Sequence, residues 1–404
     1  MTTDRANQLQ LSSFDPFDLS FRDDPYPWQP LLLEQGVGFF EPEGIPSAWV
    51  ARYADCLAVL RDWESFSSAK PKNLPGMEKV DFFNGQPVMN YSDPPDHTRR
   101  RGVVNAAFSP RRMQQISEAT AQLADRILSG IGEGQAIDIT HDLTKQFSSH
   151  ILLNDFMNVN DKDKHIFMEY VASLYLLDKV RPGEPKPQAF LDAWEKGSEY
   201  CRAAIARAKR EKSDDLIGLI VAAQEGGTLS DDEMMAMMVV LFIGGVSTMA
   251  AAGTSSLYYL AQHPDVAERV RQEPQLAKKV VEESLRLDPP VTLVMRFATR
   301  DVEVAGKTIK QGMPVYTMIS IANRDPAEFT DPNRFNIDRQ HLRHVSFGNG
   351  IHACIGNAVT RNVIPLLIQK TVQRFPDLRV DESRQTTWET TARSRHRGFQ
   401  PMLT

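Results

Sequence analysis

The sequence predicts a mainly α-helical fold with a minor β-sheet region. Three observations predict this class: long segments have helical periodicity, strand-like segments are short, and proline-rich stretches punctuate the chain. The chain has 404 residues, enough for a large core, and contains no internal repeat or low-complexity segment. We therefore expect one compact domain over residues 1–404.

The expected helices are long and contain few helix-breaking residues. Helical periodicity covers residues 112–131, 231–262 and 265–287, and a further helix is expected over about 357–375. These segments make helix the dominant element of the fold.

The expected strands are few and short. Candidates are residues 49–52 and 315–321. Residues 300–304 and 308–309 flank Ala305-Gly306-Lys307, and this order predicts a hairpin. The sheet region is therefore expected to be minor.

Charge and cysteine content limit the class of protein. The net charge of −6 argues against an electrostatic nucleic-acid binder. Three scattered cysteines, Cys56, Cys201 and Cys354, do not form a disulfide framework and indicate a reducing compartment. The first twenty residues contain no apolar run typical of a signal peptide or anchor. We therefore expect a cytoplasmic protein, without a membrane or nucleic acid as partner.

One uncharged segment allows a different interpretation. Residues 234–252 contain no charge and reach the length of a membrane span. The segment includes Gly244, Gly245 and Ser247, and acidic residues precede it. We interpret it as a helix through the core of a large protein, with a membrane span as the alternative.

The most specific motif is a glycine-rich loop around Cys354. Its sequence is Phe347-Gly348-Asn349-Gly350-Ile351-His352-Ala353-Cys354-Ile355-Gly356. Glycine permits left-handed turns and close approach to a flat ligand, and the N-terminus of a following helix favours a thiolate. The loop therefore indicates one thiolate presented to a metal. The alternative is a buried, inert cysteine in a turn.

The string Phe-x-x-Gly-x-His/Arg-x-Cys-x-Gly resembles the haem-ligand loop of the cytochrome P450 family. The resemblance implies the cytochrome P450 fold of a soluble, bacterial type, with a long distal helix over haem b (iron protoporphyrin IX). It implies that Cys354 is the axial ligand of the iron. Phe347 and Gly348 are then expected beside the haem.

The resemblance also implies which cations hold the haem propionates. His97 and Arg101 match a family pair and fall on one helical face at i, i+4. Arg296 and His352 match two further propionate ligands. An arginine fork suits bidentate binding of a carboxylate.

A structural clamp behind the haem loop is implied by a second family pattern. Glu283 and Arg286 are spaced i, i+3 and can pair on one helix face. In the family a later Pro-x-Arg-Phe arginine locks this pair, and the matching residue here is Arg334.

The oxygen side of the site departs from the family pattern. Gly245 and Thr248 match residues that make room for dioxygen and handle protons, but Ser247 replaces the usual acid. A serine hydroxyl passes a proton only as part of a chain. Three readings stay open: a relay through Ser247, Thr248 and water, an acid from elsewhere in the fold, or poor coupling with peroxide released or used.

The substrate pocket is expected to be apolar, which favours a small to medium apolar or aromatic substrate. By resemblance it draws on Phe82, Phe83, Leu174, Val246, Leu293 and Val294. The cationic run from Arg393 to Arg397 either favours a carboxylate-bearing substrate or forms a solvated turn.

The resemblance implies a monomeric monooxygenase that activates dioxygen to hydroxylate or O-dealkylate its substrate. Since the chain shows no dinucleotide fingerprint after a strand, electrons are expected from a ferredoxin and a ferredoxin reductase. The run Arg99-Arg100-Arg101, with Arg111-Arg112, is expected to steer the ferredoxin. The alternatives are a peroxide-driven peroxygenase or peroxidase, and a haem-binding sensor without turnover.

Overall fold

The computed structural model describes residues 9–69, 85–105, 108, 110–180, 184–213, 215–391 and 393–404. The chain forms two compact units, each assembled from segments that are distant in the sequence. Unit 1 comprises Met1–Met77, Glu282–Cys354 and Trp388–His396, and unit 2 comprises Glu78–Val281, Ile355–Thr387 and Arg397–Thr404. The single domain expected over residues 1–404 stays a prediction.

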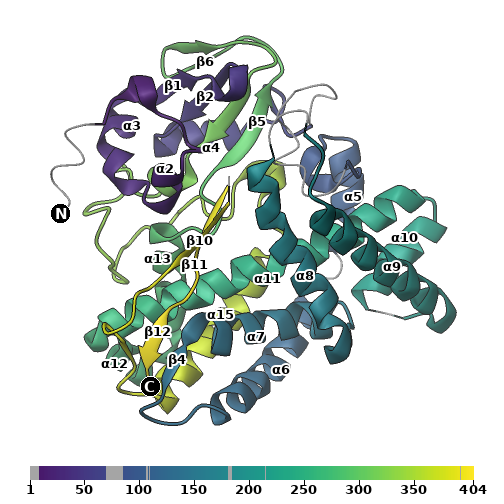
Figure 1. The fold of residues 1–404 in the computed structure, drawn as a ribbon, viewed down its shortest axis with the longest axis vertical. Helices are drawn as coiled ribbons and strands as arrows, with labels where there is room; N and C mark the ends of the chain where they lie inside the picture. The colour runs from purple at the N-terminus through teal and green to yellow at the C-terminus, as the bar shows by residue number, and fades with distance from the viewer. Residues whose placement is uncertain are drawn as a thin grey trace. The chain divides into compact units, whose positions relative to one another are not determined.

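Unit 1 is built around a five-stranded sheet in the order β1-β2-β8-β5-β3. The strands are β1 (Val37–Phe40), β2 (Ser47–Val50), β3 (Phe66–Ser67), β5 (Val294–Ala298) and β8 (Pro314–Thr317). β2 and β8 run parallel, whereas the other neighbours are antiparallel. The green strand β5 thus shares a sheet with the purple strands β1 and β2, although the sequence separates them widely (Figure 1).

Short helices and two hairpins complete unit 1. The helices are α2 (Leu19–Asp23), α3 (Gln29–Gln35), α4 (Tyr53–Arg61) and α14 (Ile319–Ala322). Apolar side chains from α4, α14 and the sheet form one buried cluster. β6 (Val302–Val304) pairs with β7 (Lys307–Ile309), and β10 (Trp388–Thr391) pairs with β11 (Ser394–Arg397). Ala305 and Gly306 turn the first hairpin with φ of 49° and 73°, which confirms the predicted hairpin.

Unit 2 is helical and is organised around α11 (Asp231–Gln262), which has the predicted bounds. Four helices pack against it: α7 (Lys145–Ser149), α9 (Gln188–Glu211), α10 (Leu216–Glu225) and α15 (Asn357–Arg374) (Figure 1). The unit also contains α5 (Asp96–Asn105), α6 (Pro110–Ser129), α8 (Lys164–Ser173) and α12 (Pro264–Gln272). A small sheet of β4 (Ala136–Asp138), β12 (Pro401–Leu403) and β9 (Arg379–Val380) includes the end of the chain.

The apolar segment expected in the core lies in α11. The helix is long and apolar enough to cross a membrane, but 69% of its most apolar window is buried inside the protein. Its first turn carries a capping box, in which Ser230 and Glu233 bond each other's backbone N–H groups. These features favour a core helix, as the sequence predicts.

Three predicted elements differ from the structure in their bounds. The helix expected over 265–287 is two helices, α12 and α13 (Ala277–Leu287), because Pro274 lacks a backbone donor and disfavours helical backbone at Glu273. The strand expected over 315–321 ends at Thr317, and α14 begins two residues later. The strand expected at 49–52 is β2, which begins and ends two residues earlier.

Candidate functional site

The loop that carries Cys354 depends on two glycines with left-handed backbone. Gly348 has a φ of 66° and Gly350 a φ of 68°. A Cβ atom at Gly350 would lie 2.7 Å from the carbonyl oxygen of Leu60, so this position lacks space as well as a favourable φ for another residue. The positive φ angles at Gly348 and Gly350 and the lack of space at Gly350 therefore explain why glycine occurs at these positions.

A single helical turn leads from these glycines to the cysteine. It is η12 (Gly350–His352), and the backbone N–H of Cys354 then donates to the carbonyl oxygen of Phe347 at 2.7 Å. In the chain, α15 begins at Asn357, three residues after the cysteine. The loop is thus closed by its own backbone, with the cysteine at its end.

Exposure distinguishes Cys354 from the two other cysteines. Cys354 is exposed, whereas Cys56 and Cys201 are buried. Burial raises the pKa of both buried thiols, that of Cys201 to about 12, so neither is a thiolate at neutral pH. The alternative of an inert, buried cysteine therefore describes Cys56 and Cys201 but does not describe Cys354.

Glu283 and Arg286 form a fully buried ion pair on α13. Both side chains are 0% exposed, and Arg286 Nε and Nη2 donate to the carboxylate at 2.8 Å each. Arg286 Nη1 also donates to the carbonyl oxygens of Asn323 and Pro332, at 2.9 and 2.6 Å. Buried charges persist only when they are paired and hydrogen-bonded, and this pair meets both conditions.

The arginine that completes the clamp is Arg339, and the prediction of Arg334 is wrong. Arg339 is 7% exposed, and its Nε donates to Glu283 Oε1 at 2.9 Å. Arg334 has an exposed side chain and contributes its backbone carbonyl oxygen, which accepts from Arg339 Nη2 at 2.9 Å. A turn from Asp331 to Arg334 leaves the Arg334 side chain in solvent, and the chain returns to Glu283 five residues later. The sequence offers no signal for this reversal, because both arginines follow the same proline.

Unit 1 also holds four of the residues expected beside the cofactor. Arg296 lies on β5 and is 6% exposed, and its Nη1 donates to the carbonyl oxygen of Met295 at 2.8 Å. Phe347, Gly348 and His352 are half-buried in the cysteine loop. A buried guanidinium is expensive to desolvate without anionic or carbonyl partners. Unit 1 thus contains a buried cation as well as the exposed cysteine.

Unit 2 holds the second expected cation pair, on α5. His97 and Arg101 are spaced i, i+4 on this helix, so they share one side of it. His97 is 3% exposed and Arg101 is half-buried. The side chains are therefore not simple solvated surface groups.

The neighbouring arginines of α5 have a structural partner. Arg99 Nη1 and Nη2 donate to the two oxygens of Glu233 at 2.8 and 2.6 Å, and Arg100 Nε donates to the same carboxylate at 2.8 Å. The Arg99 hydrogen bonds, opposed by burial, lower the pKa of Glu233 to about 2. Arg99 and Arg100 therefore tie α5 to the start of α11, and the steering of a ferredoxin by this run stays a prediction. The side chains of Arg111 and Arg112 lie outside the described part of the chain.

The expected oxygen-handling residues lie on an unbroken stretch of α11. Thr248 Oγ1 donates to the carbonyl oxygen of Gly244 at 2.8 Å, and Ser247 is half-buried. A Cβ atom at Gly244 would meet no other atom within 4 Å, whereas one at Gly245 would lie 3.0 Å from Leu152. The helix thus has open space beside Gly244 and close packing at Gly245.

The predicted pocket residues have different environments. Phe82 and Phe83 lie outside the described residues. In unit 2, Leu174 and Val246 are buried. In unit 1, Leu293 is buried, whereas Val294 is half-buried and packs against the core cluster of that unit.

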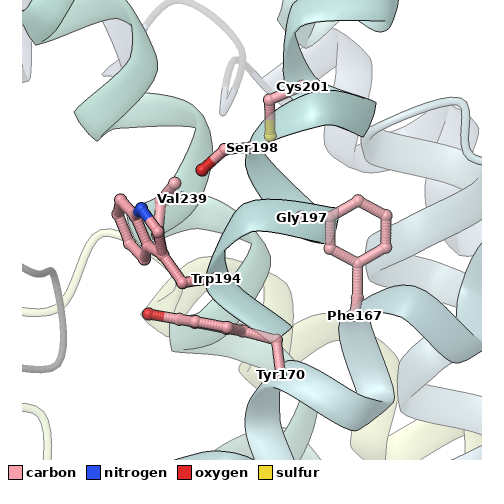
Figure 2. Close-up of a pocket in the computed structure, with 7 residues that line it drawn as sticks. All are labelled: Phe167, Tyr170, Trp194, Gly197, Ser198, Cys201 and Val239. Atoms are coloured by element: carbon pink, nitrogen blue, oxygen red, sulfur yellow. The ribbon is translucent and has the colours of Figure 1, made fainter. Parts of the chain in front are cut away.

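A small cavity of about 20 Å³ lies between α8, α9 and α11 in unit 2 (Figure 2). Its lining is apolar and aromatic: Phe167, Tyr170, Trp194, Gly197, Ser198, Cys201 and Val239. The volume corresponds to roughly one water molecule, so the cavity is too small for an organic substrate. None of the predicted pocket residues lines it.

The cationic run near the C-terminus is neither a solvated turn nor a group of free cations. Arg395 lies 3.2 Å above the ring of Trp388, and its Nε donates to the carbonyl oxygen of Asp23 at 2.8 Å. In unit 2, Arg397 lies 3.6 Å above the ring of Tyr258. Both arginines are buried and stacked on aromatic rings, so the solvated turn is wrong for them.

Comparison with known families decides between these interpretations. The family model for cytochrome P450 matches residues 40–390. The chain belongs to the cytochrome P450 family. As a cytochrome P450 it is an oxidoreductase of the monooxygenase type, and members of the family act on a substrate with dioxygen at a haem bound through a cysteine thiolate.

Relatives of known name support this assignment. Cytochrome P450 CYP199A2 of Rhodopseudomonas palustris is 31% identical over 349 residues, which cover 86% of this chain and 83% of that protein. The 6-deoxyerythronolide B hydroxylase of Saccharopolyspora erythraea is 31% identical over 345 residues, 82% of this chain and 83% of that protein. The solved structure of myxobacterial CYP267B1 with myristic acid has a TM-score of 0.86 at 26% identity, covering 96% of this chain and 98% of that one. The cytochrome P450 fold is therefore confirmed.

The described residues fit a haem. No three His, Cys, Asp or Glu side chains gather as a metal site within the described ranges. An exposed cysteine outside any such group suits a metal whose remaining ligands come from a macrocycle. In unit 1, the buried guanidinium of Arg296 suits a carboxylate of such a group.

Proposed function

We propose that Cys354 holds the iron of haem b as a thiolate, and that the chain inserts one oxygen atom into a small to medium apolar or aromatic substrate. The observation that carries this proposal is the exposed cysteine at the end of a glycine loop whose backbone closes on Phe347. When bound, the haem supplies the redox chemistry that activates dioxygen. The products are expected to be hydroxylated or O-dealkylated.

The chain's own cations would orient the haem. Arg296 and His352 in unit 1, and His97 and Arg101 in unit 2, would bind the propionates, since guanidinium and imidazolium groups pair well with carboxylates. Phe347 and Gly348 would border the flat apolar ring. The burial of Arg296 supports this role, because a desolvated guanidinium binds a carboxylate more strongly than an exposed one does.

Thr248, Ser247 and Gly245 would handle protons on the distal side. Thr248 Oγ1 holds its hydrogen toward the Gly244 carbonyl oxygen and can redirect it to a water, because a hydroxyl rotor has several partners. Ser247 would continue that chain of hydrogen bonds, with no proton reservoir of its own at neutral pH. The open space beside Gly244 leaves room for water or dioxygen.

The substrate class and the electron donor are inferred from the apolar residues of the chain and from similar proteins. Leu174 and Val246 in unit 2 supply apolar surface, and the relative CYP267B1 is solved with the apolar ligand myristic acid. A ferredoxin and a ferredoxin reductase would supply electrons to a monomer in the cytoplasm. Reconstitution with such a donor pair, with NADH oxidation followed against product, tests this part of the proposal.

The decisive test is the spectrum of the reduced, carbon-monoxide-treated protein. We expect absorption at about 450 nm for the wild type and loss of this band in Cys354→Ser. Cys201→Ser, a matched change at a buried thiol, should keep the band. A colourless wild-type protein after haem supplementation, or a band at about 420 nm in fresh protein, would overturn the proposal.

A further inference from the structure

A buried asparagine connects the Glu283–Arg286 clamp to the segment before the cysteine loop. Asn323 follows α14 directly and is 0% exposed. Its backbone carbonyl oxygen accepts from Arg286 Nη1 at 2.9 Å, and its side-chain Oδ1 accepts from the backbone N–H of Val345 at 2.9 Å. One residue therefore bonds the clamp on one side and the loop segment on the other.

Ser346 makes the second half of this connection. Asn323 Nδ2 donates to Ser346 Oγ at 2.8 Å, and the Ser346 hydroxyl donates to the carbonyl oxygen of Leu285 at 2.7 Å. Leu285 lies on α13, one residue before Arg286. The segment is thus bonded to α13 both directly and through Asn323.

A parallel contact lies one turn earlier on α13. The ring of His344 has its Nε2 3.2 Å from Glu282 Oε2, and its side chain is 0% exposed. His344 Nδ1 accepts from the backbone N–H of Ser346 at 3.2 Å. The ring also lies 5.8 Å from that of Phe347. The His344 ring is therefore held by its own segment and lies beside the Glu282 carboxylate of α13.

Two backbone hydrogen bonds connect the segment of residues 345–346 to the cysteine. The N–H of Gly348 donates to the Val345 carbonyl oxygen at 2.8 Å, and the N–H of Cys354 donates to the Phe347 carbonyl oxygen at 2.7 Å. Phe347 lies inside the turn that begins at Val345, so the acceptor of the Cys354 N–H moves with that turn. A shift of residues 345–346 would therefore displace the cysteine.

We propose that Asn323 and Ser346 are positioning residues, which set the place of the cysteine loop relative to the Glu283–Arg286 clamp. This inference rests on the proposed role of Cys354 as a thiolate ligand. Neither side chain is expected to touch the substrate or the iron. Both act by keeping the thiolate in register, because buried hydrogen-bonded networks specify one arrangement.

The test compares variants that remove these bonds without removing the clamp. Asn323→Leu keeps a similar size but lacks both polar atoms, Ser346→Ala lacks the hydroxyl, and Ser346→Thr keeps it. The readout is the rate at which the reduced, carbon-monoxide-bound protein converts from the band at about 450 nm to the band at about 420 nm in mild urea. We expect the rate to rise about tenfold in Asn323→Leu and Ser346→Ala, the factor typical of an unsatisfied buried partner. Ser346→Thr should restore the slow rate.

A matched control separates positioning from general loss of stability. Ser256 on α11 is fully buried, whereas Ser346 is half-buried, and the Ser256 hydroxyl donates to a helical carbonyl oxygen at the same 2.7 Å. Ser256→Ala should convert at the wild-type rate, with global unfolding followed by circular dichroism. Wild-type conversion rates in both Asn323→Leu and Ser346→Ala, or an equal acceleration in Ser256→Ala, would overturn the inference. A wild type without the band at about 450 nm would instead overturn the proposed function, and this inference with it.

Discussion

The environment of each cysteine decides whether its thiol can act as a metal ligand, and Cys354 differs from the other two cysteines in this respect. All three cysteines carry the same thiol, but burial raises the pKa of Cys56 and Cys201 and leaves them protonated. Cys354 is exposed at the end of a loop that two left-handed glycines shape. A thiolate ligand needs access to the metal and a stable anion, so only this environment is compatible with ligation.

Ser247 is the residue at which this chain departs from the family pattern, and it allows a sharp test. We expect Ser247→Asp to raise the yield of product per NADH severalfold, because general acid catalysis contributes about 10²–10⁴-fold to rates. Product and NADH would be measured in the same reaction. Ser247→Asn is the matched control, since it has a similar shape but no ionisable proton. Equal yields in the aspartate variant and the wild type would indicate that the native relay is already efficient.

Two helices of unit 2 are connected by one acidic side chain. Glu233 caps α11 through Ser230 and receives hydrogen bonds from Arg99 and Arg100 of α5. α5 also carries His97 and Arg101. The carboxylate therefore stabilises α5, the helix that is expected to hold a propionate. Arg99 and Arg100 have a structural role in binding this carboxylate.

We expect Glu233→Gln to lower the free energy of unfolding by about 2 kcal/mol, because hydrogen bonds to charged groups contribute about 1.5–3 kcal/mol. In the wild type, folding lowers the pKa of the Glu233 carboxyl from an ordinary 4.5 to about 2. The carboxylate therefore stabilises the folded protein fully above pH 4.5, and this stabilisation is lost as the pH falls toward 2. Urea unfolding of both proteins at several pH values measures this. The difference between them should be constant near neutral pH and shrink in acid.

Glu268→Gln provides the control for that prediction. Glu268 pairs with Arg271 at the same kind of distance, 2.5 Å, but lies exposed at i, i+3 on α12. Exposed pairs contribute little, so this variant should unfold like the wild type. An equal loss of stability in the two variants would contradict the role of Glu233 as a connector between helices.

Gly197 tests the packing of α9. It lies inside the helix, and a Cβ atom there would meet no other atom within 4 Å. Since glycine inside a helix costs about 0.5–1 kcal/mol relative to alanine, Gly197→Ala should raise the free energy of unfolding by that amount. Gly218→Ala on α10 should do the reverse, because its Cβ would lie 1.8 Å from the Ser213 carbonyl oxygen. Thermal unfolding of both variants checks the opposite signs.

At the scale of the whole molecule, the clamp ties distant parts of unit 1 together. Arg286 bonds to Glu283, to the carbonyl oxygen after α14 and to the carbonyl oxygens of Pro332 and Arg334. Loss of one partner from a buried ion pair leaves the other charge uncompensated, which lowers the free energy of unfolding by about 3–5 kcal/mol. The clamp is therefore expected to affect assembly rather than a single chemical step.

The two candidate arginines make this testable. Arg339→Ala should lower the haem content of the purified protein severely, as should Arg286→Leu, because each breaks a buried ion pair. Arg334→Ala should keep full haem content, since its side chain is exposed and its carbonyl oxygen stays in place. Haem per protein is measured by absorbance after extraction. A severe loss in Arg334→Ala, with normal Arg339→Ala, would contradict the assignment.

The sequence by itself determined the mainly helical class, the bounds of α11, the β6–β7 hairpin and the cysteine loop. These features are local: periodicity, turn residues and a dense motif depend on neighbours in the chain. The family and its general chemistry follow from the same motif.

Only the tertiary structure decided that Arg339 rather than Arg334 completes the clamp, and that Arg99 and Arg100 bind Glu233. It also decided that Arg395 stacks on Trp388. In each case the partner is far away in the sequence or hidden by a turn of the chain. A charged residue type can indicate a docking surface, a ligand or a buried pair, and the choice among them depends on burial and on the partners that the fold brings near.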